Sequence, residues 1–181
     1  MKRLIKLLEN NIILCLLLFS LTDCSQQDLI PTNVLNNKLN ILLPKDFVLM
    51  NNKMLEVKYP IAERRPTEVY TDDSGAINIA ISLTNNQVSL EQLPDVEKAL
   101  KKQFARTSNI TLNSSKITSV NDRKYVILDF YSQAIDSRIY NLMYVTSLND
   151  KMLLITFNCK TDYLPKWYSI GQKIIGSIKI L

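Results

Sequence analysis

Apolar and polar residues alternate most regularly in the segment AINIAISLT, residues 76–84. A period of two is typical of a β-strand that buries one face. The segment RRPTEVYT before it is rich in strand-forming residues, and DDSG between the two segments has the composition of a tight turn. The pattern therefore predicts a β-hairpin over residues 64–84, whose buried face carries Ile77, Ile79, Ile81 and Leu83.

Two later segments have the period of an amphipathic helix. The first is predicted to run from Pro94 to about Thr107, because proline is tolerated in the first turn of a helix but not beyond it. The second is predicted to begin at a cap at Thr161 or Asp162 and to be weakened by two glycines. The apolar stripes consist of Leu93, Val96, Leu100 and Phe104 in the first helix and of Trp167, Ile170, Ile174 and Ile178 in the second; the glycines are Gly171 and Gly176.

Between these helices, residues 110–158 have the pattern of four successive strands, with turns at VNDRK, QAIDSR and SLNDK. The segments YVILDFY and MLLITF are apolar on both faces, so these strands are predicted to be central and covered on each side. Upstream, residues 39–50 predict a first strand broken by Pro44, followed by a short helical turn. Four tyrosines have the spacing of core residues in these strands: Tyr125, Tyr131, Tyr140 and Tyr144.

This order of elements predicts an α+β fold, a three-layer α/β/α sandwich around a mostly antiparallel sheet. The opening segment LPKDFVLM, the hairpin RRPTEVYT-DDSG-AINIAIS, the amphipathic helix and the strands that close on IIGSIKI resemble the PsbP/DcrB-like superfamily over residues 39–181. The resemblance implies an antiparallel sheet between helices. It also implies a small, non-enzymatic binding, assembly or accessory protein, often exported or lipid-anchored, and it carries over no catalytic residues.

The first 23 residues have the pattern of a secretory signal peptide, with three cations before an apolar run that is too short to span a bilayer comfortably. The segment LTDC at its end resembles the lipobox of bacterial lipoproteins, which implies cleavage before Cys24 and acylation of its thiol. Asp23 departs from the lipobox pattern, in which a small uncharged residue precedes the cysteine. Ordinary cleavage that leaves Cys24 as a thiol, and an uncleaved anchor, are the alternatives.

The polar, Asn-rich residues 24–38 are predicted to be a tether between this anchor and the domain. The domain itself occupies residues 39–181. Acidic and basic residues are interspersed in it, so the formal charge of +5 favours no nucleic-acid partner, which would need basic residues clustered on one face. If Cys24 is acylated, Cys159 has no disulfide partner in the domain, and we expect it to be a buried, inert thiol near a strand end.

The chain contains no histidine. Nucleophilic systems that need a histidine base, and histidine-based metal sites, are therefore excluded. Three widely separated glycines cannot form a phosphate-binding loop. We expect no enzymatic activity, no cofactor and no metal. Asp129 is the most unusual acid, because it lies inside YVILDFY; an ion pair or an exposed position at the sheet edge is expected, with a functional carboxylate as the alternative.

Two adjacent arginines, Arg64 and Arg65, precede Pro66 in a predicted loop beside Glu63. Guanidinium groups bind carboxylates and phosphates through paired, charge-assisted hydrogen bonds. These arginines are therefore the candidate binding residues of the domain. The alternative is a solvated loop without a binding role.

These features together predict a non-catalytic lipoprotein of the bacterial cell envelope that acts as a binding or assembly accessory module. Its expected partners are the membrane, through the lipid on Cys24, and an unidentified envelope protein. Ser25 after the cysteine permits sorting to the outer membrane, facing the periplasm, in a Gram-negative cell. The alternative function is a small-ligand carrier or sensor with a pocket between the sheet and a helix.

Overall fold

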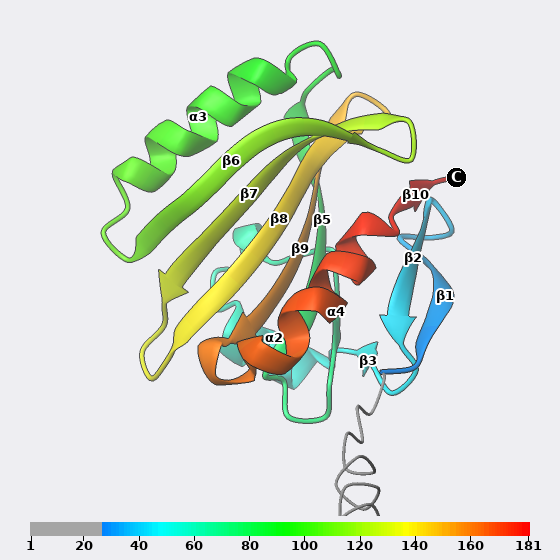
Figure 1. Ribbon diagram of the computed structural model, residues 1–181, viewed down its shortest axis with the longest axis vertical. Helices are drawn as coiled ribbons and strands as arrows, with labels where there is room; N and C mark the ends of the chain where they lie inside the picture. The colour runs from blue at the N-terminus through cyan, green and yellow to red at the C-terminus, as the bar shows by residue number, and fades with distance from the viewer. Residues whose placement is uncertain (1–26) are drawn as a thin grey trace, which may run out of the picture.

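The computed structural model describes residues 27–181, which form two antiparallel sheets and three α-helices (Figure 1). The predicted signal peptide and Cys24 lie outside the described residues. The large sheet has seven strands in the order β3-β4-β5-β9-β8-β7-β6, and the small sheet has the order β1-β2-β10. The elements are β1 (Leu29–Val34), β2 (Leu39–Pro44), β3 (Val48–Leu49), α2 (Asn52–Lys58), the 3-10 helix η1 (Ala62–Arg64), β4 (Glu68–Thr71), β5 (Ile77–Gln87), α3 (Leu93–Ala105), β6 (Ile110–Val120), β7 (Arg123–Gln133), β8 (Arg138–Leu148), β9 (Lys151–Lys160), the 3-10 helix η2 (Thr161–Tyr163), α4 (Leu164–Gly176) and β10 (Lys179–Ile180).

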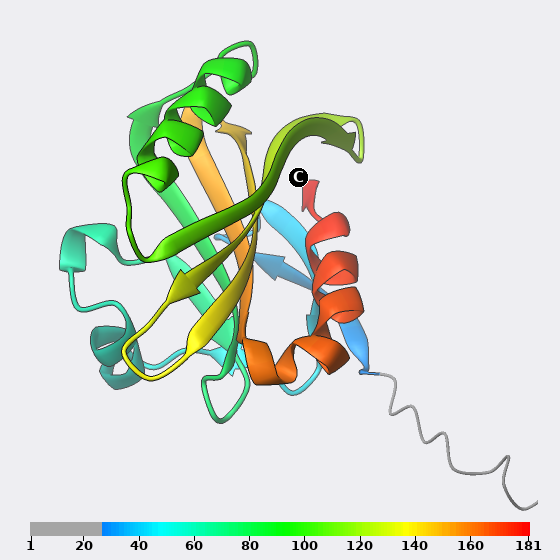
Figure 2. The same ribbon diagram turned by 60° about the vertical axis from the view of Figure 1, so that its left-hand side comes forward.

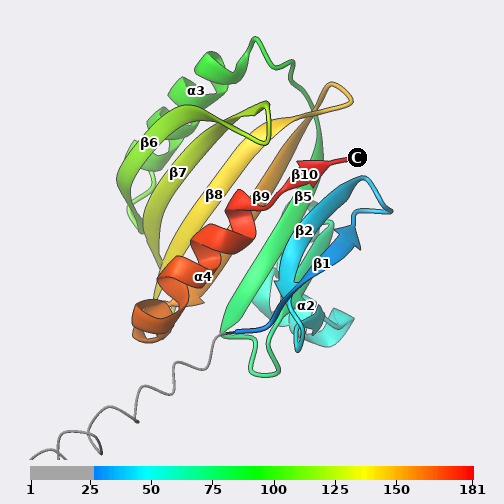
Figure 3. The same ribbon diagram turned by 45° about the vertical axis from the view of Figure 1, so that its right-hand side comes forward.

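The predicted α+β class and three-layer arrangement are confirmed (Figure 2). One face of the large sheet packs against α3, which contacts β6 and β7. The opposite face packs against α4, which contacts β8, β9 and β2. The second covering layer differs from the prediction, because it combines one helix with the small sheet beside it (Figure 3).

The predicted tether is the main correction to the sequence analysis, because residues 29–34 form strand β1. This strand pairs antiparallel with β2 along its whole length. The turn between them places Leu35, Asn36 and Asn37 at positive φ angles of 53°, 52° and 60°. Asparagine tolerates this left-handed conformation better than most residues. The Asn-rich composition that suggested a flexible linker is therefore the composition of a tight turn.

Residues 39–50 do not form one interrupted strand. Strand β2 ends at Pro44 and belongs to the small sheet, whereas β3 belongs to the large sheet. The other main elements agree with the sequence patterns, except that the predicted cap at Thr161 or Asp162 is wrong. These two residues lie in η2, and α4 begins at Leu164 without a side-chain cap. Helix α3 has Pro94 in its first turn, and the turns before β7 and β9 have Asn-Asp pairs at positive φ. Within residues 27–181, no helix has both the length and the hydropathy needed to cross a membrane.

Helix α4 lies unusually close to the large sheet at Gly171. A Cβ atom at this position would lie 2.6 Å from ring atoms of Phe157 on β9. Both residues are buried, and the Phe157 side chain has no exposed surface. The absence of a side chain at Gly171 therefore sets the distance between the helix and the sheet.

Candidate functional site

A groove with a volume of about 600 Å³ lies on the α3 face of the large sheet, between α3 and the segment that contains η1. We call it the arginine groove. Its rim carries Arg64 and Arg65 on one side and Gln103 of α3 on the other. Its apolar lining consists of Leu100 and Phe104 of α3 and of Met143, Met152 and Leu154 of β8 and β9. Ser82 and Thr84 of β5 add polar groups to the floor.

The groove exists because two helices cover separate parts of one sheet face. Cross-strand partners share a face, and one row of partners runs Val69–Ala80–Thr156–Met143–Leu128 across five strands. At one end of this row, Val69 and Ala80 pack with residues of α2. At the other end, Leu128 packs with residues of α3. Between the two helices, residues of β5, β8 and β9 form the floor of the groove.

The two arginines differ in how the protein holds them. Arg64 ends η1 and is exposed, and its side chain has no hydrogen bond within the described part of the chain. Arg65 is half-buried, and its Nε donates a 2.8 Å hydrogen bond to the carbonyl oxygen of Tyr59. Within residues 27–181 the ion pair Lys160–Asp136 is the only one, so neither arginine has a carboxylate partner, although Glu63 also lines the groove.

This arrangement suits a partner that has both negative charge and apolar surface. Arg64, and the Arg65 nitrogens that Tyr59 does not occupy, can bind a carboxylate in paired hydrogen bonds. Met143 and Met152 are half-buried, and their flexible thioethers adapt to irregular apolar surfaces. The sequence patterns identified Arg64 and Arg65 but missed the floor. Met152 lies inside a strand that was predicted to be covered on both faces, and no site was predicted in the strand that contains Met143.

Within residues 27–181, Asp129 has no ion-pair partner, and it does not lie on an edge strand, so both expectations for it are wrong. It is half-buried on β7, one strand in from the edge. The Tyr140 hydroxyl donates a 2.9 Å hydrogen bond to one carboxylate oxygen, and the Asn113 amide donates another of 2.9 Å to the second oxygen. Asn113 lies at a bulge in β6, where the register with β7 shifts. Burial, and then the hydrogen bond to Asp129, raise the pKa of Tyr140, so its hydroxyl remains a donor at neutral pH.

We expect Tyr140→Phe to lower the free energy of unfolding by about 2 kcal/mol, because it removes a hydrogen bond to a half-buried carboxylate. Urea denaturation measures this loss. Tyr168→Phe is the control, since Tyr168 packs against the Tyr140 ring at 5.7 Å but is more exposed. Equal stabilities of Tyr140→Phe and the unmodified protein would show that the hydrogen bond to Asp129 contributes nothing.

Cys159 is fully buried near the end of β9, as predicted. Burial raises the pKa of its thiol to about 12, so the nucleophilic thiolate is scarce at neutral pH. Elsewhere in residues 27–181, no three side chains of the acidic or cysteine type gather as a metal site would require. The arginine groove is therefore the site that the sequence candidates and the structure share.

Comparison with known proteins supports the fold. No protein-family model and no curated protein matches the sequence. Among solved structures, the cyanobacterial PsbP (CyanoP) of Synechocystis sp. PCC 6803 is similar with a TM-score of 0.60 and 13% identity, over 86% of this chain and 94% of that one. LpqN of Mycobacterium tuberculosis, described as involved in cell envelope biogenesis, has a TM-score of 0.54 and 10% identity, over 86% and 91% of the two chains.

A Bacteroides thetaiotaomicron VPI-5482 protein is also similar, with a TM-score of 0.52 and 9% identity over 83% of this chain. The match spans about half of that protein, 48% of its length. At these identities the likeness concerns the fold and not the activity. The domain described here has a PsbP-like fold.

Proposed function

We propose that this chain is a cell-envelope accessory protein that acts by binding, without catalysis, and that the arginine groove holds an acidic segment of an envelope protein. The observation that carries the proposal is the groove itself. It places two arginines, neither of which has a carboxylate partner within residues 27–181, beside apolar side chains that are mostly half-buried. Paired guanidinium groups next to adaptable apolar surface are typical of protein recognition sites.

The location of the protein is part of the proposal. The lipobox-like segment that ends at Cys24 predicts an acylated N-terminus. Strand β1 begins at Leu29, five residues after this cysteine. The domain would then be held close to a membrane surface, facing the periplasm of the outer membrane if the cell is Gram-negative. The fold likeness to LpqN, a protein involved in cell envelope biogenesis, supports an envelope role.

The arginines are tested by cross-linking in living cells. A photo-reactive amino acid replaces Asn86, which is exposed and lines the groove beside the arginines. We expect a protein adduct whose yield falls at least about tenfold in Arg64→Ala/Arg65→Ala, because two charge-assisted contacts are lost. Gel shift and mass spectrometry of the adduct give the yield.

The matched control is Lys101→Ala/Lys102→Ala on α3, which removes two adjacent exposed cations that do not line the groove. Its adduct yield is expected to be unchanged. Arg64→Ala alone separates binding from folding, because Arg64 makes no side-chain hydrogen bond within residues 27–181, whereas Arg65 supports Tyr59. An adduct that persists without both arginines, or repeated failure to find any protein adduct, would contradict the proposal.

The volume of the groove, about 600 Å³ between the sheet and α3, also suits the alternative function of a small-ligand carrier or sensor. The same experiment distinguishes the two functions. A carrier would give no protein adduct at Asn86 and would instead retain a small amphiphile on purification. Mass spectrometry of the intact, natively purified chain detects such a ligand.

A further inference from the structure

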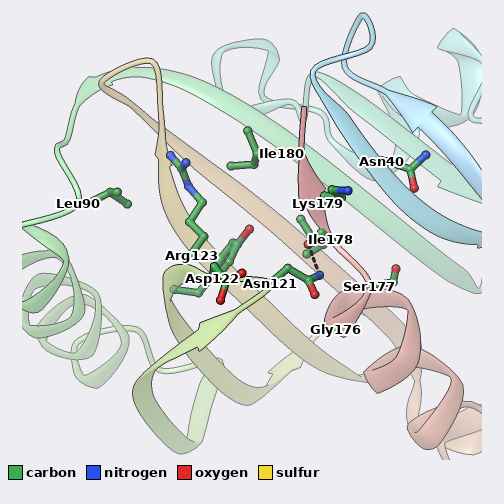
Figure 4. A pocket seen from close by; sticks show the side chains of 11 residues that line it. Asn40, Leu90, Asn121, Asp122, Arg123, Gly176, Ser177, Ile178, Lys179 and Ile180 are labelled. Carbon is green, nitrogen blue, oxygen red and sulfur yellow. Dashed lines mark hydrogen bonds between the residues drawn. The ribbon is translucent and has the colours of Figure 1, made fainter.

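A second cavity, of about 750 Å³, lies on the opposite face of the large sheet. It is bordered by the turn between β6 and β7, by the end of α4 and by β10, and it is open to solvent (Figure 4). We call it the hairpin cavity. The turn is fastened to the C-terminal segment by the Asn121 amide, which donates a 2.8 Å hydrogen bond to the carbonyl oxygen of Ile178. Its walls are therefore held in place by the fold.

Tyr125 lines this cavity and is fully buried. Its hydroxyl has no hydrogen-bond partner among the described residues. A buried hydroxyl without a partner destabilises a protein, and such groups are uncommon enough to need an explanation. Burial raises the pKa of Tyr125 to about 12, so the hydroxyl keeps its proton and is available as a donor at neutral pH.

Arg123 lines the same cavity and also lacks a full set of partners. One terminal nitrogen donates to the carbonyl oxygen of Ser147, and Nε lies 3.4 Å from the Thr146 hydroxyl. No carboxylate within residues 27–181 lies within 4.0 Å of its guanidinium, although the exposed Asp122 is its neighbour in sequence. Both side chains line the same cavity, and the charge of Arg123 opposes the rise in the pKa of Tyr125 that burial causes.

The cavity also offers apolar surface. Leu90 and Ile180 are half-buried, and Figure 4 shows Arg123 extending into the space between them. A half-buried cation, an unpartnered buried donor and two aliphatic side chains therefore border one space. This combination matches a ligand with one small anionic group and a short apolar body.

We propose that the hairpin cavity binds a small organic carboxylate, whose oxygens accept hydrogen bonds from Arg123 and from the Tyr125 hydroxyl while its apolar body lies against Leu90 and Ile180. The ligand carboxylate accepts hydrogen bonds from the Tyr125 hydroxyl and from the Arg123 guanidinium nitrogens that have no acceptor within residues 27–181. This site lies on the opposite face of the sheet from the arginine groove and does not depend on the function proposed for that groove.

Calorimetric titration of the full chain with hexanoate tests the proposal. Hexanol has a similar body without the charge, and inorganic phosphate has charge without the body. We expect hexanoate to bind more tightly than either probe and to bind about tenfold more weakly to Tyr125→Phe, because one hydrogen bond to a charged group is lost. Arg123→Met is expected to weaken binding further.

Tyr125→Phe has a second readout that a merely structural hydroxyl would not share. Without ligand, we expect its melting temperature to be equal to or above that of the unmodified protein, since no hydrogen bond is broken. Tyr140→Phe is the matched control, with lower stability and unchanged hexanoate binding. Three results would each overturn the proposal: no binding of hexanoate, equal binding by Tyr125→Phe, or phosphate or hexanol binding as tightly as hexanoate.

Discussion

Replacing Gly171 with alanine is expected to lower the free energy of unfolding by about 3 kcal/mol, measured by urea denaturation. In most helices this substitution stabilises the protein, because alanine has the higher helix propensity. Here the new Cβ would meet the Phe157 ring at 2.6 Å. That ring is fully buried in β9 and cannot move aside without displacing its neighbours. Overpacking therefore outweighs helix propensity.

Gly176→Ala provides the control within the same helix. A Cβ atom there meets nothing within 4 Å, so we expect the free energy of unfolding to rise by about 0.5 kcal/mol. The double variant Gly171→Ala/Phe157→Leu should recover part of the lost stability, because the smaller side chain gives up the clashing ring atoms. Equal effects of the two glycine substitutions would contradict the close contact between α4 and β9.

Replacing Cys24 with alanine is expected to abolish acylation completely and to release the protein from membranes. Each buried CH₂ of an acyl chain contributes about 0.8 kcal/mol, so two or three chains anchor a protein firmly and their loss is decisive. The intact mass of the chain extracted from bacterial membranes measures the change. We expect a mature chain that begins at Cys24 with added acyl mass, and neither feature in Cys24→Ala.

Cys15→Ala is the control for this prediction. Cys15 lies in the apolar run of the predicted signal peptide, upstream of the cleavage point, so its loss should leave the mature mass unchanged. A soluble chain without acyl mass in the unmodified protein would show that Asp23 prevents lipobox processing. The domain would then be free in its compartment, which would favour the carrier function.

Local patterns predicted the longer strands of the large sheet and both long helices, because each of these elements is defined by residues that are close in the sequence. The alternation around Ile79, the Asn-Asp turns and the stripe that includes Phe104 are each complete within a few residues. The small sheet could not be predicted in this way. Its strand β10 has two residues, and it exists because Lys179 pairs with Asn40 from the far end of the chain. A strand this short has no period of its own.

The binding site was predictable only in part, because local sequence patterns do not show tertiary contacts. Arg64 and Arg65 could be identified as candidates because they are adjacent in the sequence. The groove beside them depends on the gap between α2 and α3 over β8 and β9, which is a tertiary property. The spacing of Tyr125 correctly predicted a core residue, but it could not show that the hydroxyl lacks a hydrogen-bond partner within residues 27–181. Hydrogen-bond partners of Asp129 come from two neighbouring strands and a bulge.

The central claim is that charge on Arg64 and Arg65 binds an acidic partner segment in the arginine groove. A charge-reversal experiment in cells tests it most directly, once the peptide cross-linked at Asn86 has been sequenced. Arg64→Glu/Arg65→Glu should abolish the adduct, and reversing the acidic residues of the partner segment to lysine should restore it. An adduct that survives the reversed arginines, or one that the reversed partner does not restore, would contradict the claim.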